Sequence, residues 1–164
     1  MRLSELLVPE LVFPDLVAPR KEDALALVTA RLCERHPELD RRRLRAALFA
    51  RERLLSTALA AGVAIPHARL AGLSRMIAAF GRSRDGIAWD AQDGEPTRLF
   101  VVLLVPEDAC GAHLKLLAAI ARWLRDPGCR TRLMRAPDAM LLDALRIEEH
   151  HAIARAARST PMPA

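Results

Sequence analysis

Apolar residues follow two kinds of spacing along this chain, and each kind predicts a different element. Spacings of three and four residues, as on one face of a helix, predict helices at 3–7, 21–36, 41–54, 113–126, 129–135 and from 137 onward. Short apolar segments bounded by breaking residues predict strands at 11–17, 64–66, 75–82 and 87–90. The unbroken apolar run 99–105 predicts a central strand that is covered on both faces.

Breaking residues indicate where some of these elements end. Asp85-Gly86 predicts a turn after the strand at 75–82. Pro66 has no N–H for a strand ladder and biases the residue before it toward an extended conformation. We therefore expect the strand at 64–66 to end there, with His67 at its mouth.

Length and composition are those of one globular domain. The 164 residues are 52% hydrophobic and 27% charged, and no apolar run approaches the roughly 20 residues that span a bilayer. The N-terminus lacks a basic segment followed by an apolar core, so we expect a cytoplasmic protein without membrane insertion. We expect one domain over 1–150 and a basic, frayed tail over 151–164.

The cysteine pattern and the charge distribution narrow the classes of function. Cys33, Cys110 and Cys129 are odd in number and lack metal-ligand spacing, so we expect free thiols. The net charge of +5 admits an acidic partner. The basic residues are nevertheless spread along the chain, and there is no tyrosine for a base-stacking platform. We therefore expect no binding of nucleic acid.

Arg51 is a candidate binding residue because it lies on the apolar stripe of a predicted helix. This helix, at 41–54, is expected to have Asp40 as its cap, and Leu44 and Leu48 precede Arg51 on the stripe. A guanidinium on a buried face costs free energy unless it meets an anion. The alternative is that its stem packs while its charged head reaches water near the helix end.

Two histidines lie at positions where sheets and helices commonly bind ligands. His67 follows the predicted strand at 64–66, and open α/β sheets bind ligands at the ends of their strands. His113 lies in the first turn of a predicted helix, where free N–H groups favour anions. Each has a simpler alternative: His67 as a loop residue packed under a turn, and His113 as a donor to a carbonyl.

Two histidines and an arginine near a helix N-terminus suit phosphoryl transfer at nitrogen. A neutral imidazole nitrogen is nucleophilic near pH 7 without a separate base. Arginine and helix amides offset the charge of an incoming phosphoryl group. Sequence spacing alone does not show that Arg51, His67 and His113 converge. His150 and His151 are expected to be exposed to solvent rather than to bind a metal.

Four sequence blocks follow one another at intervals that are shared by one protein family. The first is Arg51-Glu52-Arg53-Leu54-Leu55-Ser56-Thr57, and the second is Gly62-Val63-Ala64-Ile65-Pro66-His67. The third runs from Ile87-Ala88-Trp89-Asp90-Ala91 through Leu99 to Val105-Pro106, and the fourth is His113-Leu114. Together, over about residues 3–149, the chain resembles the phosphotransferase-system (PTS) IIA domains of the fructose/mannitol class, in particular the nitrogen-regulatory IIA proteins.

The resemblance implies a fold, a chemistry and a partner. The fold would be α/β, a single-domain sandwich whose mixed, mainly parallel sheet is flanked by helices on both faces. His67 would accept a phosphoryl group from the histidine-phosphocarrier protein, His113 would hydrogen-bond that group or orient His67, and Arg51 would stabilise its charge. Ser56 and Thr57 would add hydroxyl donors to the phosphate. No cofactor or metal is expected.

Three functions stay open. The first is a phosphocarrier of the nitrogen-regulatory type, whose phosphorylation state alters its binding to protein partners such as transporters or kinases. The second is a sugar-specific IIA unit that passes phosphate to a IIB domain, and the third is an interaction module that no longer turns over phosphate. Four positions where the family often has glycine carry other residues here, namely Leu55, Ala58, Ala60 and Ala68. We therefore expect an altered rate of phosphorylation or an altered partner surface.

Overall fold

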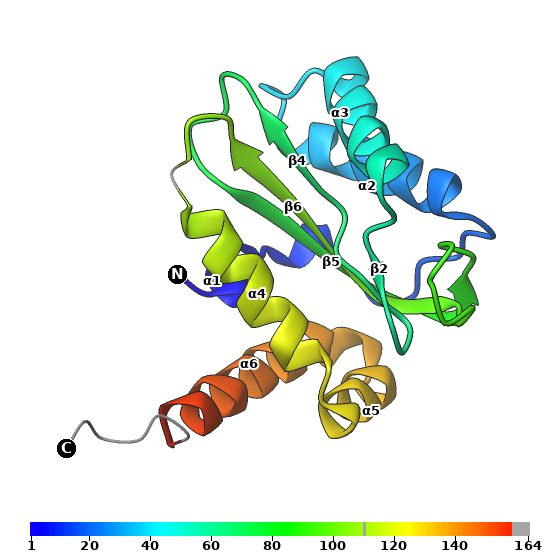
Figure 1. Cartoon of the computed structure of the whole chain (residues 1–164), viewed down its shortest axis with the longest axis vertical. Coiled ribbons are helices and arrows are strands. Elements are labelled where there is room, and N and C mark those ends of the chain that lie inside the picture. The colour runs from blue at the N-terminus through cyan, green and yellow to red at the C-terminus, as the bar shows by residue number, and fades with distance from the viewer. Residues whose placement is uncertain (110, 159–164) are drawn as a thin grey trace.

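A long antiparallel strand pair, β5 and β6, lies at the centre of the molecule (Figure 1). The computed structural model describes residues 1–109 and 111–158. Strand β5 spans Ile77–Ile87, and strand β6 spans Thr97–Pro106. The apolar run at 99–105 therefore forms a central strand, as predicted.

Strand β6 is buried on both faces because its side chains alternate between two cores. Leu99, Val101 and Leu103 belong to one core, and Phe100 and Val102 belong to the other. The first core is covered by α1 (Leu3–Leu6), α4 (Ala112–Leu124), α5 (Pro127–Arg135) and α6 (Leu141–Arg158). The second core is covered by α2 (Lys21–Arg35) and α3 (Arg41–Leu54). Figure 1 shows these two groups of helices on opposite sides of the sheet.

Four short strands complete the sheet, and most of them run parallel to their partners. They are β1 (Val12–Phe13), β2 (Ala58–Leu59), β3 (Val63–Ala64) and β4 (His67–Leu70). The pairs β1–β5, β3–β6 and β4–β6 are parallel, whereas β2–β3 is antiparallel. Two 3₁₀ helices, η1 (Pro9–Leu11) and η2 (Asp138–Met140), lie in connections. The predicted α/β class, with a mixed, mainly parallel sheet between helices, is confirmed.

A strand does end just before Pro66, since β3 stops at Ala64, but His67 does not lie at a free strand end because a second strand, β4, begins at that residue. Pro66 interrupts the ladder since it lacks an N–H, but its carbonyl accepts a hydrogen bond from the Leu103 amide at 2.9 Å. The chain therefore stays beside β6, and His67 is the first residue of β4.

The turn predicted at Asp85-Gly86 is wrong, because β5 continues to Ile87. The register of the β5–β6 pair shifts between Arg82 and Ile87, and Gly86 has a φ of 84° within this irregularity. The glycine therefore serves a bulge inside the hairpin rather than its turn.

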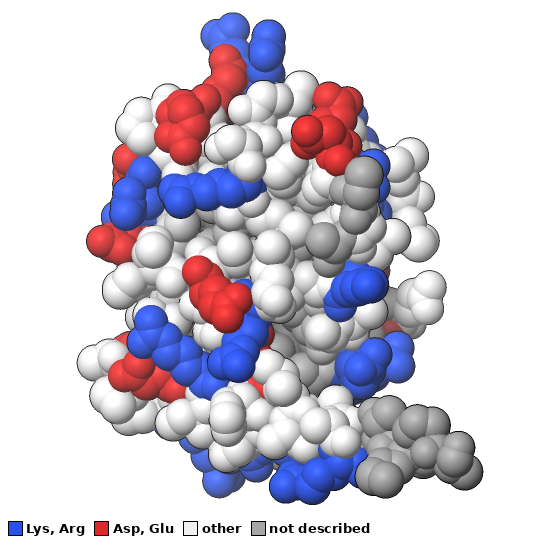
Figure 2. All heavy atoms as spheres, turned by 90° about the vertical axis from the view of Figure 1, so that its left-hand side faces the viewer, with Lys and Arg blue, Asp and Glu red and all other residues white. Residues whose placement is uncertain are grey.

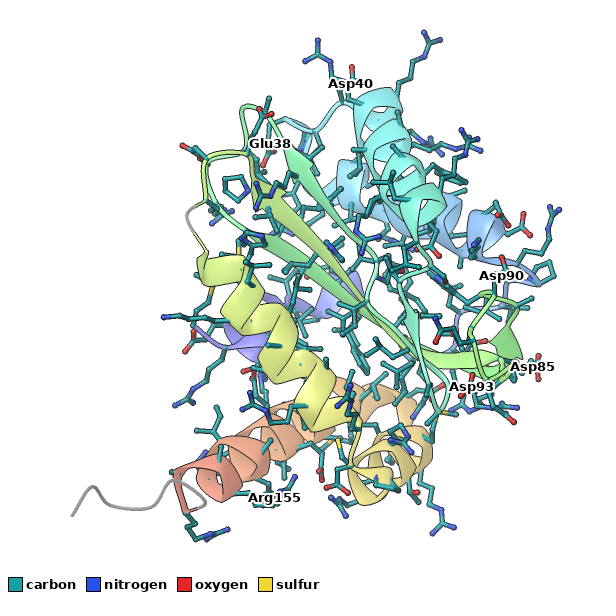
Figure 3. All side chains as sticks on the ribbon, in the orientation of Figure 1. Glu38, Asp40, Asp85, Asp90, Asp93 and Arg155 are labelled. Atoms are coloured by element: carbon teal, nitrogen blue, oxygen red, sulfur yellow. The ribbon has the colours of Figure 1, made fainter. Side chains whose placement is uncertain are left out.

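The start of α3 agrees with the sequence, whereas the end of α6 extends beyond the predicted domain. Asp40 caps α3, as predicted, with its side chain accepting from the Arg43 amide at 2.8 Å, and Figure 3 shows it at the start of that helix. Helix α6 extends to Arg158, so it includes residues 151–158 of the segment predicted as a tail. Residues 159–164 and Cys110 lie outside the described residues.

The cysteine thiols and the distribution of surface charge are as the sequence predicts. Cys33 and Cys129 are free thiols. On the face shown in Figure 2, basic and acidic side chains are interspersed rather than gathered by sign. Within residues 1–109 and 111–158, no helix combines the length and the apolar character that crossing a bilayer requires.

Candidate active site

His67 begins β4, and both nitrogens of its ring are engaged. Nδ1 lies 2.8 Å from the carbonyl oxygen of Ile65, and Nε2 lies 3.1 Å from Nε of Arg51. Because arginine only donates, Nε2 accepts this hydrogen bond and carries the lone pair. Nδ1 therefore carries the proton and donates it to Ile65. The neutral ring thus has Nε2 as its nucleophilic nitrogen, directed at a guanidinium.

Arg51 reaches His67 from the last turn of α3. Its Nη1 donates to the carbonyl of Leu55, the C-cap residue of this helix, at 2.8 Å. The last carbonyls of a helix have no partner within the helix and carry partial negative charge, so a guanidinium is stabilised there. Arg51 is therefore held at two points, and its position on the helix stripe brings it to His67.

The pKa of His67 is lowered from its usual value of 6.5. Burial is the largest cause, because it disfavours the charged imidazolium. The positive charge of Arg51 and the presence of His113 lower the pKa further, whereas the hydrogen bond to Ile65 acts in the opposite direction. The ring is therefore neutral at pH 7, which is the form that has a nucleophilic nitrogen.

Ser56 and Thr57 lie in the loop after α3, where their hydrogen bonds go to Glu52. The Glu52 carboxylate is 5% exposed and accepts from the Thr57 amide at 3.1 Å, the Thr57 hydroxyl at 2.5 Å and the Ser56 hydroxyl at 3.0 Å. No hydrogen bond among the described residues joins either hydroxyl to His67. Both hydroxyls are therefore occupied by a buried carboxylate that the sequence does not single out.

Lys21 places a positive charge beside this carboxylate. Its Nζ lies 3.4 Å from Glu52 and 2.8 Å from Asp90, which Figure 3 shows beside the start of α2. The carbonyl of Trp89, the residue before Asp90, lies 3.0 Å from the Ser56 hydroxyl. Helix α2, the loop after α3 and the segment before β6 are thus joined around Glu52, and they support the loop that holds Arg51.

His113 lies in the first turn of α4, as predicted, and is 4% exposed. Its Nε2 lies 3.1 Å from Nη2 of Arg69, which donates this hydrogen bond. The proton of the neutral ring is then on Nδ1, which is buried and has no hydrogen-bond partner in the described part of the chain. His113 is thereby connected through Arg69 to the strand that carries His67.

Arg69 is a residue of this site that the sequence reasoning missed. Strand β4 places it two residues after His67, so the two side chains lie on the same face of the strand. The alternation of side chains would identify it, but only if a second strand is known to begin at His67. The sequence does not predict that strand, and it therefore does not point to Arg69.

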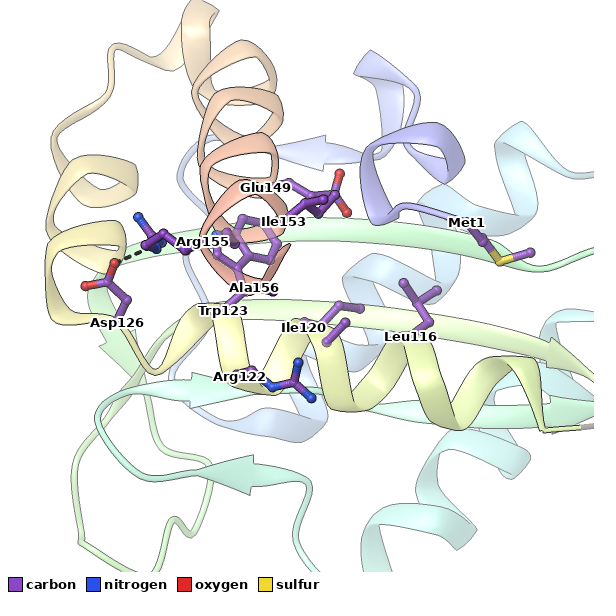
Figure 4. A pocket seen from close by; sticks show the side chains of 12 residues that line it. Met1, Leu116, Ile120, Arg122, Trp123, Asp126, Glu149, Ile153, Arg155 and Ala156 are labelled. Atoms are coloured by element: carbon purple, nitrogen blue, oxygen red, sulfur yellow. Dashed lines mark ion pairs between the residues drawn. The ribbon is translucent and has the colours of Figure 1, made fainter. Parts of the chain in front are cut away.

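Two other candidate features lie apart from this site. His150 and His151 are exposed on α6, as expected. The described residues contain no group of three or more His, Cys, Asp or Glu side chains arranged for a metal ion. A cavity of about 700 Å³ lies between α4 and α6, where Leu116, Ile120 and Ile153 form part of its wall (Figure 4). None of the predicted site residues lines this cavity.

The sequence and the fold belong to one class of protein, the PTS IIA domains. The sequence model of the family described as "Phosphoenolpyruvate-dependent sugar phosphotransferase system, EIIA 2" matches residues 5–145. The chain belongs to this family. It is 37% identical over 142 residues to a nitrogen regulatory protein of Bradyrhizobium diazoefficiens. The aligned residues cover 87% of this chain and 92% of that protein.

Solved structures give the same assignment. The nitrogen regulatory protein IIA-Ntr from Neisseria meningitidis superposes with a TM-score of 0.81 at 35% identity, over 87% of this chain and 98% of that chain. The mannitol IIA of Escherichia coli, solved in complex with a phosphorylated IIB, superposes with a TM-score of 0.67 over 85% of this chain and 96% of that chain. Its identity is 20%, so it supports the fold alone. The predicted family and fold are confirmed.

Proposed function

We propose that this protein is a phosphocarrier that accepts a phosphoryl group on Nε2 of His67. The observation that carries the proposal is the pair of hydrogen bonds on this ring. Donation from Nδ1 to Ile65 leaves the lone pair on Nε2, and the lowered pKa keeps the ring neutral. Arg51, at 3.1 Å from Nε2, lies where the negative charge of the phosphoryl group arrives.

The donor is a phosphohistidine of the histidine-phosphocarrier protein. Nε2 of His67 uses its lone pair to form a bond to phosphorus, while the phosphorus–nitrogen bond to the donor imidazole breaks and that ring keeps the electron pair. The Nδ1 proton stays on His67, and its hydrogen bond to the Ile65 carbonyl stabilises the positive charge that the ring acquires. Arg51 loses the lone pair as its acceptor and donates to the phosphoryl oxygens instead.

The remaining predicted residues have different relations to the phosphoryl group. His113 has a proton on Nδ1 without a partner among the described residues, which supports its predicted role as a donor to the phosphoryl group. Ser56 and Thr57 reach a phosphate only if their hydroxyls leave Glu52. We therefore assign the first contacts with the phosphoryl group to Arg51 and His113.

The similarity to nitrogen regulatory proteins over most of the chain favours a regulatory role. In this role the phosphorylation state changes the charge of the surface around His67, and protein partners such as transporters or kinases bind one state. The alternative is a sugar-specific unit that passes phosphate to a IIB domain, because the fold is shared with a mannitol IIA that was solved with phosphorylated IIB.

The experiment is intact-mass spectrometry at alkaline pH, which preserves phosphohistidine. The protein is incubated with phosphoenolpyruvate, enzyme I and the histidine carrier. We expect one added phosphate in the wild type, none in His67→Ala and slower uptake in His113→Ala. The matched control is His150→Ala, which changes an exposed histidine on α6 and should behave as wild type.

Two outcomes separate the alternatives. If the wild type takes up no phosphate from a carrier that phosphorylates a known IIA domain, the phosphocarrier proposal fails and the chain is an interaction module. If the phosphorylated protein transfers its phosphate to a purified IIB domain at a rate comparable to that of a sugar-specific IIA, the sugar-specific role replaces the regulatory one.

A further inference from the structure

Arg69 connects the two histidines of the site from strand β4. It lies on the same face of the strand as His67, and its Nη2 donates to Nε2 of His113 at 3.1 Å. Each imidazole therefore has one arginine on its Nε2: Arg51 on His67 and Arg69 on His113. Arg51 thus lies on the ring that would carry the phosphoryl group, and Arg69 lies on His113, whose interaction with His67 helps to lower the pKa of that ring.

Arg69 is free to exchange its partner. Its side chain is exposed, and the ion pairs among the described residues do not include it. Its hydrogen-bond acceptor in this structure is a neutral ring nitrogen. A guanidinium binds a charged phosphoryl oxygen in preference to such a nitrogen, because it gains opposite charge and the geometry for two parallel hydrogen bonds. Residues two apart on a strand lie roughly 7 Å from each other, which an extended arginine side chain spans.

We propose that Arg69 is a second phosphoryl-binding residue, which leaves Nε2 of His113 and binds the phosphoryl oxygens when His67 is phosphorylated. The inference rests on the proposed function, since it concerns the phosphorylated state of the same histidine. It adds a structural consequence to that state: His113 loses its partner on Nε2 each time His67 gains a phosphoryl group.

The first test compares the equilibrium between this protein and the phosphorylated histidine carrier. In Arg69→Gln, we expect the ratio of phosphorylated to free protein to fall by about tenfold, the order of one hydrogen bond between charged groups at an exposed site. Arg69→Lys keeps the charge without the fork and should recover part of the loss. Arg53→Gln is the matched control, because Arg53 is exposed and two residues from Arg51 on α3, where side chains do not face each other.

The second test follows the ¹⁵N resonance of His113 Nε2 by NMR, before and after phosphorylation. In the free wild type this nitrogen accepts a hydrogen bond from the Arg69 guanidinium, and in free Arg69→Gln that charged donor is removed. We expect phosphorylation of the wild type to move the resonance toward its position in the free variant, because Arg69 has left. In Arg53→Gln the resonance should move as in the wild type. Thermal melts of all the variants establish that each is folded.

Three outcomes of these tests would overturn the inference about Arg69. If Arg69→Gln is phosphorylated to the same extent as the wild type, the inference is overturned and the proposed function stands. If Arg69→Gln is impaired but the His113 resonance of the wild type does not move on phosphorylation, Arg69 acts by holding His113, which also overturns it. If the wild type itself takes up no phosphate, the proposed function fails and the inference fails with it.

Discussion

At the scale of single residues, Arg51 affects His67 through charge as well as through a hydrogen bond. Replacing it with glutamine removes a positive charge that lowers the pKa of His67, so we expect that pKa to rise. Burial is the larger cause and persists in the variant, so the pKa should stay below 6.5. An NMR titration of the His67 ring measures this, and an unchanged or lower pKa would contradict the assignment.

The same variant has a kinetic consequence. Phosphoryl acceptance needs the neutral form of His67, so the wild-type rate should stay on its plateau as the pH falls through 6.5 and decline only below it. In Arg51→Gln the decline should begin at higher pH, and the plateau rate should be about 100-fold lower, as when one preorganised donor to a developing charge is removed. Phosphorylation rates measured between pH 5 and 8 test both effects.

Glu52 acts on the site through the loop that it holds. In Glu52→Gln, one of the two carboxylate oxygens becomes an amide that cannot accept from Thr57 or Ser56. We expect a loss of about 1–3 kcal/mol in the free energy of unfolding, and slower phosphorylation because the Leu55 carbonyl no longer holds Arg51. Urea unfolding measures the first effect. The matched control, Glu34→Gln, changes an exposed carboxylate on α2 and should leave both quantities unchanged.

The sequence identified Arg51 and His113 because each lies on the periodic stripe of a helix, which is a local signal. It missed Arg69, whose partner His113 is 44 residues away. It also missed Glu52, whose partner Thr57 is five residues away in the following loop. Hydrogen bonds of this kind depend on where a loop folds back or where a strand continues, and residue spacing does not encode either. Ser56 lies in the loop that the sequence predicts after α3, but its acceptor, Glu52, lies on the helix itself.

At the scale of elements, the hairpin of β5 and β6 requires a glycine at position 81, because the ring of Phe100 occupies the space that a side chain would need. A Cβ added at Gly81 would lie 1.9 Å from the Cζ atom of Phe100, whose ring stacks on Trp89 at 5.9 Å between centroids. We expect Gly81→Ala to lower the free energy of unfolding by about 1–3 kcal/mol, the cost of overpacking a core.

A double-mutant cycle shows whether this contact is the cause. Phe100→Leu alone leaves a cavity and is destabilising, but it makes room for the added methyl group of Gly81→Ala. The double variant should therefore lose less free energy of unfolding than the sum of the losses in the two single variants. Strict additivity in urea unfolding would show that the cost of Gly81→Ala comes from the backbone instead.

The elements themselves show which signals the sequence carries reliably. The apolar run of β6 predicts its strand because burial on both faces requires apolar residues at every position, whatever the partners are. Pro66 and Gly86 each break a local pattern, but pairing with β6 begins again in β4 at His67, and β5 continues through Gly86 to Ile87. A partner strand far along the chain thus overrides a breaking residue when it offers hydrogen bonds on both sides of the break.

At the scale of the whole molecule, Arg82 joins segments that lie far apart in the sequence. Its side chain is fully buried on β5. Nε donates to the Pro14 carbonyl at 2.7 Å, and Nη1 donates to the carbonyls of Leu133 and Ala136 at 2.8 and 2.7 Å. Nη2 donates to Asp138 at 2.6 Å. One guanidinium thus holds the segment after β1, the end of α5 and the start of η2 on the sheet.

Replacing Arg82 with methionine keeps much of the volume but leaves these carbonyls buried without donors. We expect the free energy of unfolding to fall by about 3–5 kcal/mol, the range for removing one partner of a buried charged network. Arg84→Met is the matched control, because Arg84 also binds Asp138 from the same strand but is exposed, so it should cost about 1 kcal/mol or less. The side-chain hydrogen bonds of Arg82 within the described part of the chain go neither to the loop after α3 nor to β4, so the folded variant should keep the His67 pKa and its phosphorylation. Equal losses of stability in the two variants would show that Asp138, rather than the buried carbonyls, accounts for the effect of Arg82.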